Sequence, residues 1–202
     1  MTIDLFISCV MDQFYPETAK NVVKILNMAG VDVEYNPEQT CCGKFAYKSG
    51  FVEEAKELGE KFLHDFPNDR TVVGVNASCV GYIKTHYKDL FYNTASHLEY
   101  KRLVANIYEL TDFLVNKINF LNFGAEFNHR VVYQDTCCSL RELGLKDEGR
   151  KLLSNVKGVE IVEIQRPELC CGFGSGLFSI QHEAISVAMA EHKIKDAMSV
   201  GA

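Results

Sequence analysis

The stretch Gln39-Thr40-Cys41-Cys42-Gly43 returns later in the chain as Glu168-Leu169-Cys170-Cys171-Gly172. A single cysteine precedes each copy at nearly the same distance, since 31 residues separate Cys9 from the first pair and 32 separate Cys137 from the second. Between these markers, both halves carry an apolar helical pattern, a Gly-Val turn and a short apolar strand pattern. Internal repeats of this size predict two similar structural units.

Strand patterns alternate with helical patterns along both halves. We expect strands at 3–7, 31–35, 71–75, 130–133 and 159–164, and helices at 51–66, 97–118 and 182–198. This alternation predicts parallel sheets flanked by helices. The fold class is therefore α/β, with two similar Rossmann-like half-domains.

The repeat also predicts domain limits. Residues 1–118 form the first repeat with a long connecting helix, 119–129 a linker, and 130–202 the second repeat. In the first repeat Cys79 follows the third strand, and the matching position of the second repeat falls beyond Ala202. We expect the second half to lack its last strand and the metal-ligating cysteine that would follow that strand, as in a truncated chain. The alternative is a second half that needs only three segments.

Composition narrows the class of protein. A net charge of -6 over 202 residues, without a block of like charges, argues against a nucleic-acid partner, because phosphate binding needs clustered Lys and Arg. The first ten residues lack a basic region and are too polar for a signal peptide or a membrane span. We expect a cytoplasmic protein, in which thiols stay reduced, so the eight cysteines indicate metal ligands or redox groups rather than disulfides.

Four cysteines of the first half are expected to converge. Cys9 and Cys79, like Cys137 in the second half, follow apolar strands at the carboxyl end, where open parallel sheets bind ligands. The Cys41-Cys42-Gly43 turn returns toward a helix N-terminus and can bring its two thiols to the same point. Four thiolates are the number that an iron–sulfur cubane or a structural zinc requires. Because zinc sites favour Cys-x-x-Cys spacing, the Cys-Cys pair favours an iron–sulfur cluster.

Glycines accompany both cysteine pairs. Gly43 and the run Gly172-Phe173-Gly174-Ser175-Gly176 supply backbone without side chains, as a closely approached cluster needs. The run also resembles a nucleotide-phosphate loop or an ordinary turn. A phosphate loop would follow a strand directly, without two cysteines in front, so this alternative is disfavoured.

The motifs around the cysteines closely resemble the lactate-utilization protein A family, a two-repeat Cys-Cys-Gly (CCG) domain family, along the whole chain. The segments that carry the resemblance are Cys9 with Phe14-Tyr15-Pro16-Glu17, Gln39-Thr40-Cys41-Cys42-Gly43, Ser78-Cys79-Val80-Gly81, Asp135-Thr136-Cys137, Leu140-Arg141-Glu142-Leu143-Gly144 and Cys170-Cys171-Gly172-Phe173-Gly174.

The resemblance implies the electron-transfer component of a bacterial complex that oxidises L-lactate, or a related 2-hydroxyacid such as glycolate, to the 2-oxoacid. The lactate-utilization protein A family is also similar to the iron–sulfur cluster subunits of glycolate oxidase and heterodisulfide reductase. The resemblance further implies that one [4Fe-4S] cluster is ligated in the first half and that the second half holds a second site. The ligand residues of the two sites are Cys9, Cys41, Cys42 and Cys79, and Cys137, Cys170 and Cys171, with Gly43 and Gly172 at the turns.

Two positions depart from those relatives. Tyr82 stands where the heterodisulfide reductase subunits carry a fifth cysteine, and Cys138 stands where relatives usually carry His. Two other functions remain open: a zinc-stabilised interaction module, and a thiol–disulfide redox subunit that uses Cys41-Cys42 or Cys170-Cys171. No catalytic base or hydride-transfer motif stands out, so the oxidoreductase activity is expected only with partner subunits.

Overall fold

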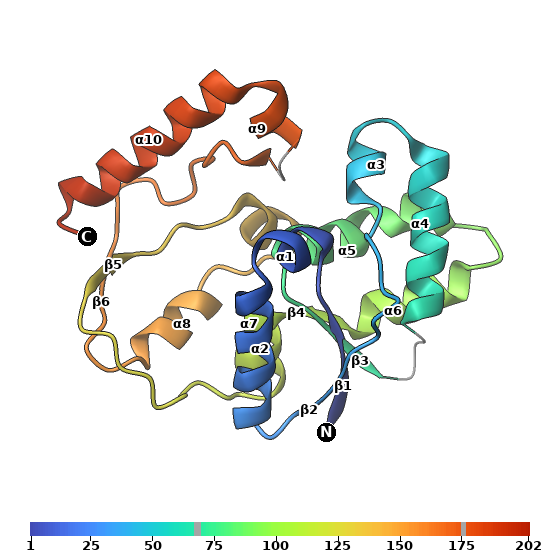
Figure 1. The fold of residues 1–202 in the computed structure, drawn as a ribbon, viewed down its shortest axis with the longest axis horizontal. Coiled ribbons are helices and arrows are strands. Elements are labelled where there is room, and N and C mark those ends of the chain that lie inside the picture. Colours follow the sequence, from blue (N-terminus) through green and yellow to red (C-terminus); the bar gives the residue numbers. More distant parts are fainter. Residues whose placement is uncertain (67–69, 175–176) are drawn as a thin grey trace. The chain divides into compact units, whose positions relative to one another are not determined.

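The computed structural model describes residues 1–66, 70–174 and 177–202. The chain divides into two compact units, Met1–Lys117 and Ile118–Ala202 (Figure 1). Each unit contains a parallel sheet and helices, so the predicted α/β class with two similar halves is confirmed. None of the helices in the described ranges is long and apolar enough to cross a membrane.

The first unit is built on a four-stranded parallel sheet with the order β2-β1-β3-β4. Its strands are β1 (Thr2–Phe6), β2 (Asp32–Glu34), β3 (Thr71–Gly74) and β4 (Ile107–Glu109). Its helices are α1 (Cys9–Phe14), α2 (Pro16–Met28), α3 (Lys44–Lys48), α4 (Val52–Asp65), α5 (Ala77–Phe91), α6 (His97–Asn106), α7 (Leu110–Asp112) and the π-helix η1 (Phe113–Lys117).

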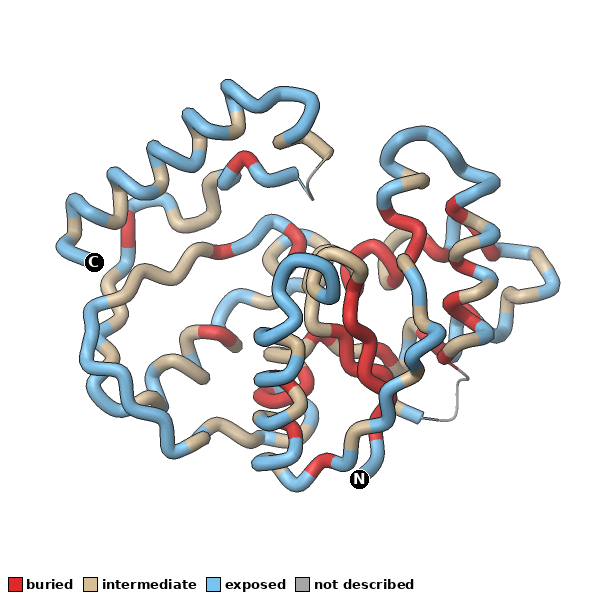
Figure 2. Tube along the Cα trace, viewed as in Figure 1, coloured by how far each residue is buried: buried red, intermediate tan, exposed pale blue. Residues whose placement is uncertain are grey.

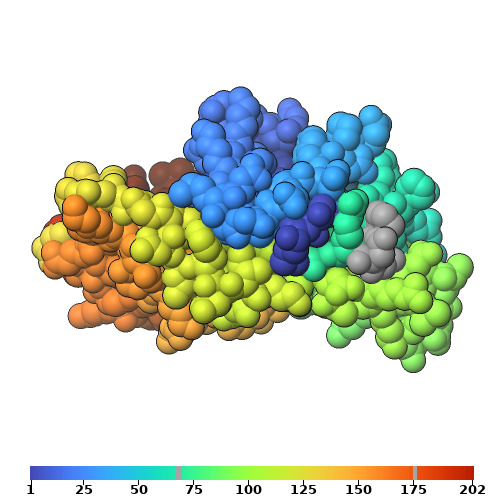
Figure 3. All heavy atoms as spheres, turned by 90° about the horizontal axis from the view of Figure 1, so that it is seen from below, coloured from blue at the N-terminus to red at the C-terminus, as the bar shows by residue number. Residues whose placement is uncertain are grey.

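Helices cover both faces of this sheet. Figure 1 shows α2 on one face and α4, α5 and α6 on the other. In Figure 3, α2 (blue) and α6 (green) lie on opposite sides of the start of β1 (dark blue). Because a parallel strand is covered on both faces, its sequence is nearly continuously apolar. Ile3, Leu5 and Phe6 of β1 are accordingly buried.

An aromatic cluster fills the space between β1 and the helices α4 and α5. The ring of Phe62 packs edge-on against Phe6, with ring centres 4.8 Å apart, and lies 6.1 Å from the ring of Tyr87. Figure 2 shows buried residues concentrated on β1, β3 and the helix segments against them. This cluster is the part of the core that fixes α4 and α5 on the sheet.

The predicted helix at 97–118 is confirmed only in part, because a short strand interrupts it. The helix α6 ends at Asn106, and the next three residues form β4, which pairs in parallel with β3. The apolar spacing of this segment is compatible with a helix. Residues 107–109 form a strand instead, because the edge of β3 offers them backbone hydrogen bonds. Glu109 then caps the following turn, since its carboxylate accepts hydrogen bonds from the backbone N–H groups of Thr111 and Asp112.

The second unit repeats the start of the first. Its parallel strands are β5 (Arg130–Val132) and β6 (Glu160–Val162), and its helices are the π-helix η2 (Cys138–Glu142), α8 (Glu148–Ser154), α9 (Leu177–Gln181) and α10 (Glu183–Ser199). The register is also repeated, because Arg130 pairs with Glu160 at the same sequence separation as Thr2 with Asp32. The described residues of this unit contain no counterpart of β3.

Replacing Phe62 tests the aromatic cluster. We expect Phe62→Ala to lower the free energy of unfolding by about 3–5 kcal/mol, because it leaves a cavity among Phe6, Phe66 and Tyr87. Phe14→Ala is the matched control: the Phe14 side chain is 73% exposed, and the change should stay within about 0.5 kcal/mol. Urea unfolding measures both, and equal losses would contradict the packing described.

Candidate metal centre

Two cysteines are placed by the carboxyl ends of adjacent strands. Cys9 opens α1 just after β1, and the Ser8 side chain caps that helix by accepting a hydrogen bond from the N–H of Met11. Cys79 lies in the first turn of α5 just after β3, where the Asn76 side chain accepts from the N–H of Ser78 at 2.9 Å. Since β1 and β3 are paired, both thiols start from the same edge of the sheet.

The turn at Cys41-Cys42-Gly43 brings in two more thiols. Gly43 has a φ of +86°, and a Cβ there would lie 2.9 Å from the carbonyl oxygen of Ala55 on α4. Only glycine fits this left-handed, closely approached position. The turned backbone lets the Gly43 N–H donate a 3.4 Å hydrogen bond to Cys41 Sγ.

A half-buried amide holds this turn against the end of β1. The side chain of Gln39 accepts a hydrogen bond from the N–H of Ile7 at 2.8 Å and donates to the carbonyl of Leu5 at 3.2 Å. On the other side, the Tyr87 hydroxyl of α5 donates to the carbonyl of Cys42 at 3.0 Å. The two contacts fix the cysteine pair between β1 and α5.

The four thiols of the first unit touch in a chain from Cys9 to Cys41 to Cys42 to Cys79. Hydrogen bonds from the thiols of Cys42 and Cys9 lower the pKa of Cys41 to about 2. A hydrogen bond from Cys42 is the main cause that lowers the pKa of Cys79. The same bonds, together with burial, raise the pKa of Cys9 and of Cys42. The thiols of Cys9 and Cys42 therefore act as donors, and the thiolate form is favoured at Cys41 and Cys79.

This donor set suits a thiolate-bound metal group. Metal ligands must be deprotonated, and the lowered pKa values of Cys41 and Cys79 favour that form. Four cysteines are the usual ligand set of a [4Fe-4S] cluster. No group of three or more His, Cys, Asp or Glu side chains in residues 1–66, 70–174 and 177–202 is arranged around one metal-ion position. The four thiols thus suit an iron–sulfur cluster by their chemistry. In this structure they contact one another in successive pairs.

A buried cation lies beside these thiols. The side chain of Lys44, 6% exposed, follows Gly43 directly, and its Nζ donates to the Ser78 carbonyl at 2.9 Å and to the Ser78 hydroxyl at 2.7 Å. Its charge adds to the hydrogen bond from Cys42 in lowering the pKa of Cys79. Lysine is almost never buried without compensating charge. The sequence analysis missed this residue, although its place directly after the cysteine pair was a usable signal.

The second unit repeats the turn but not the contacts. Gly172 has a φ of +84°, its N–H donates to Cys170 Sγ at 3.4 Å, and a Cβ there would lie 2.8 Å from the Ser186 carbonyl of α10. Cys137, Cys170 and Cys171 are exposed. In the described part of this unit they form no hydrogen bonds with one another. Ser175 and Gly176 of the predicted glycine run lie outside the described residues.

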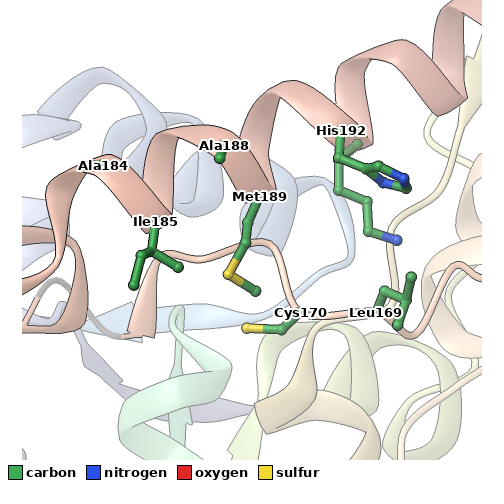
Figure 4. A pocket seen from close by; sticks show the side chains of 8 residues that line it. Leu169, Cys170, Ala184, Ile185, Ala188, Met189 and His192 are labelled. Atoms are coloured by element: carbon green, nitrogen blue, oxygen red, sulfur yellow. The ribbon is translucent and has the colours of Figure 1, made fainter.

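Cys170 lies at an apolar pocket. Figure 4 shows Ile185 and Met189 pointing from α10 toward the segment that carries Cys170, and these residues line a largely apolar pocket of about 610 Å³.

An ion pair lies two residues before Cys137. The Arg150 guanidinium donates to both carboxylate oxygens of the buried Asp135, at 2.7 and 3.2 Å. The ion pair holds the segment between β5 and Cys137, and it was not predicted because its partners are joined only by the fold.

Comparison with known proteins assigns the family. The cysteine-rich (CCG) domain family matches residues 3–84 and 131–202, one match for each repeat. Lactate utilization protein A 2 of Bacillus cereus (strain Q1) is 38% identical over 196 residues, which is 96% of this chain and 81% of the relative. The chain belongs to the lactate utilization protein A family.

Other members of the lactate utilization protein A family are equally similar. Lactate utilization protein A of Oceanobacillus iheyensis is 40% identical over 194 residues, covering 96% of this chain and 79% of the relative. Lactate utilization protein A 2 of Bacillus anthracis (strain A0248) is 37% identical over 196 residues, covering 96% and 81%. The family resemblance predicted from the cysteine motifs is thereby confirmed.

Replacing Gly43 tests the turn of this family member. Gly50 is a matched control because it has nearly the same φ, +87°, but open space where a Cβ would stand. We expect Gly50→Ala to cost about 1–2 kcal/mol of unfolding free energy for the left-handed backbone alone. Gly43→Ala should cost clearly more, because its Cβ also collides with the Ala55 carbonyl. Equal losses in urea unfolding would show that the close approach to α4 is not a constraint.

Proposed function

We propose that this chain is the iron–sulfur electron-transfer component of a multi-subunit complex that oxidises L-lactate, or a related 2-hydroxyacid such as glycolate, to the 2-oxoacid. The observation that carries the proposal is the contact among four thiols drawn from three separate segments of the first unit. The names of the relatives, which are lactate utilization proteins, supply the substrate class.

In this proposal a [4Fe-4S] cluster is bound by Cys9, Cys41, Cys42 and Cys79. When bound, it supplies one-electron transfer at a potential set by nearby hydrogen bonds, charge and burial. The protein positions the ligands: Gly43 turns the backbone and donates to Cys41, and Tyr87 holds the carbonyl of Cys42. Lys44 offsets the negative charge of a thiolate-bound cluster.

A second site in the proposal uses Cys137, Cys170 and Cys171, with Gly172 at its turn. The repeated N–H donation to Cys170 supports this assignment. Oxidation of the hydroxyacid carbon takes place in a partner subunit, and we place the complex in the cytoplasm, where these free thiols stay reduced.

Metal analysis of the anaerobically reconstituted chain tests the cluster. We expect about four iron and four sulfide per first-unit site, the content of a [4Fe-4S] cluster. Cys42→Ser should lose that amount, because it removes a ligand in the middle of the chain of thiols. Cys138→Ser, which also removes a buried thiol but not a proposed ligand, should keep the wild-type content.

The same experiment separates the other two functions. Stoichiometric zinc in a colourless protein would replace the proposal by a zinc-stabilised interaction module. Metal-free protein whose activity is lost on alkylation of Cys41 or Cys42 would indicate a thiol–disulfide redox subunit, as in heterodisulfide reductase. Iron loading that is unchanged in Cys42→Ser would contradict the assignment of the first-unit ligands.

Replacing Lys44 tests the role of the buried charge. Lys44→Met should lower the reduction potential of the cluster by on the order of 100 mV, because the reduced form carries more negative charge and loses a nearby cation. Lys48→Met removes the same charge one turn later on α3, where the side chain is exposed and solvent screens it, so its shift should be much smaller. Equal shifts in a redox titration would contradict a specific role for Lys44.

A further inference from the structure

One hydroxyl beside the thiols has no hydrogen-bond partner in the part of the chain that the structure describes. The side chain of Tyr82 on α5 is 0% exposed, and its Oη has no hydrogen-bond partner among the described residues. Buried tyrosine hydroxyls normally find one, because an unpaired buried polar group is costly. The unpaired hydroxyl therefore points to an acceptor that the described residues do not provide.

The surroundings of Tyr82 are the segments that carry the thiols. It lies three residues after Cys79 on α5, hence on the same side of that helix. Its ring centre is 5.4 Å from that of Tyr47 on α3 and 5.6 Å from that of Tyr87, whose hydroxyl holds the Cys42 carbonyl. Tyr82 is thus enclosed between the helix of Cys79 and the turn of Cys41 and Cys42.

The hydroxyl is also kept as a donor. Burial is the main cause that raises the pKa of Tyr82, and the electrostatic influence of Cys42 and Tyr47 raises it further. A tyrosine in this position stays protonated, while sulfide and thiolate sulfurs are acceptors without protons of their own.

We propose that the Tyr82 hydroxyl donates a hydrogen bond to a sulfur of the cluster held by Cys9, Cys41, Cys42 and Cys79, and so raises the reduction potential of that cluster. The inference rests on the proposed function. A hydrogen bond to the more negative, reduced form is the stronger one, so the donor stabilises reduction. Tyr82 is a tuning residue and not a catalytic one.

The test compares Tyr82→Phe with Tyr47→Phe in the reconstituted chain. Both remove one phenol hydroxyl from adjacent rings, but the Tyr47 hydroxyl already donates to Asp89 at 3.1 Å. In a redox titration followed by electron paramagnetic resonance, Tyr82→Phe should make reduction about tenfold less favourable, which is a shift of about 59 mV to lower potential. Tyr47→Phe should leave the potential unchanged.

Two further measurements report on the hydroxyl directly. Pulsed paramagnetic resonance of the reduced wild type in D2O should detect an exchangeable deuteron near the cluster that is missing in Tyr82→Phe. The metal-free Tyr82→Phe chain should be no less stable to urea than the metal-free wild type, since its hydroxyl has no partner among the described residues.

The outcomes separate this inference from the proposed function. A wild type that takes up no cluster overturns both. A wild type and a Tyr82→Phe variant that both carry the cluster at the same potential overturn only the role of Tyr82. Equal shifts in both tyrosine variants, or a clear loss of stability in metal-free Tyr82→Phe, also overturn it, because the hydroxyl would then act through the protein fold.

Discussion

Sulfur atoms from three separate segments meet at the carboxyl edge of one sheet. Several contacts of the first unit hold these segments in place. The adjacent strands β1 and β3 set the starting points of Cys9 and Cys79. The left-handed Gly43, pressed against α4, turns the cysteine pair toward them. Gln39 and Tyr87 then fix the pair by hydrogen bonds to the backbone on either side. Because four thiol groups this close repel one another when charged, they share protons, and a metal group that replaces those protons relieves the repulsion.

The two units share a backbone design and differ in what surrounds it. Strand register, the conformation of the turn glycine and the N–H donation to the first cysteine of the pair are all repeated. In the first unit, however, Cys42 is 2% exposed and a buried lysine follows the turn. In the second, Cys137, Cys170 and Cys171 are exposed, and Phe173, itself 52% exposed, stands in the place of Lys44. The repeat therefore carries the geometry, and the neighbouring side chains determine the charge and burial of each site.

The sequence predicted those features that depend on local pattern. The short apolar strands and the helices 51–66 and 182–198 follow from periodicity, and the convergence of Cys9, Cys41, Cys42 and Cys79 follows from strand ends and an internal repeat. Features that depend on tertiary contact could not be predicted. The strand β4 forms only because β3 offers an edge, so its residues were assigned to a helix. The contacts of Lys44 with Ser78 likewise form only when α3 and α5 pack together. The same packing buries the Tyr82 hydroxyl without a hydrogen-bond partner among residues 1–66, 70–174 and 177–202.

The proposed function requires that the sulfurs of residues 9, 41, 42 and 79 bind one cluster. An iron anomalous difference map from crystals of the anaerobically reconstituted chain tests this requirement. We expect iron density bounded by these four Sγ atoms. No iron density among these four sulfurs, or a single zinc ion in its place, would contradict it.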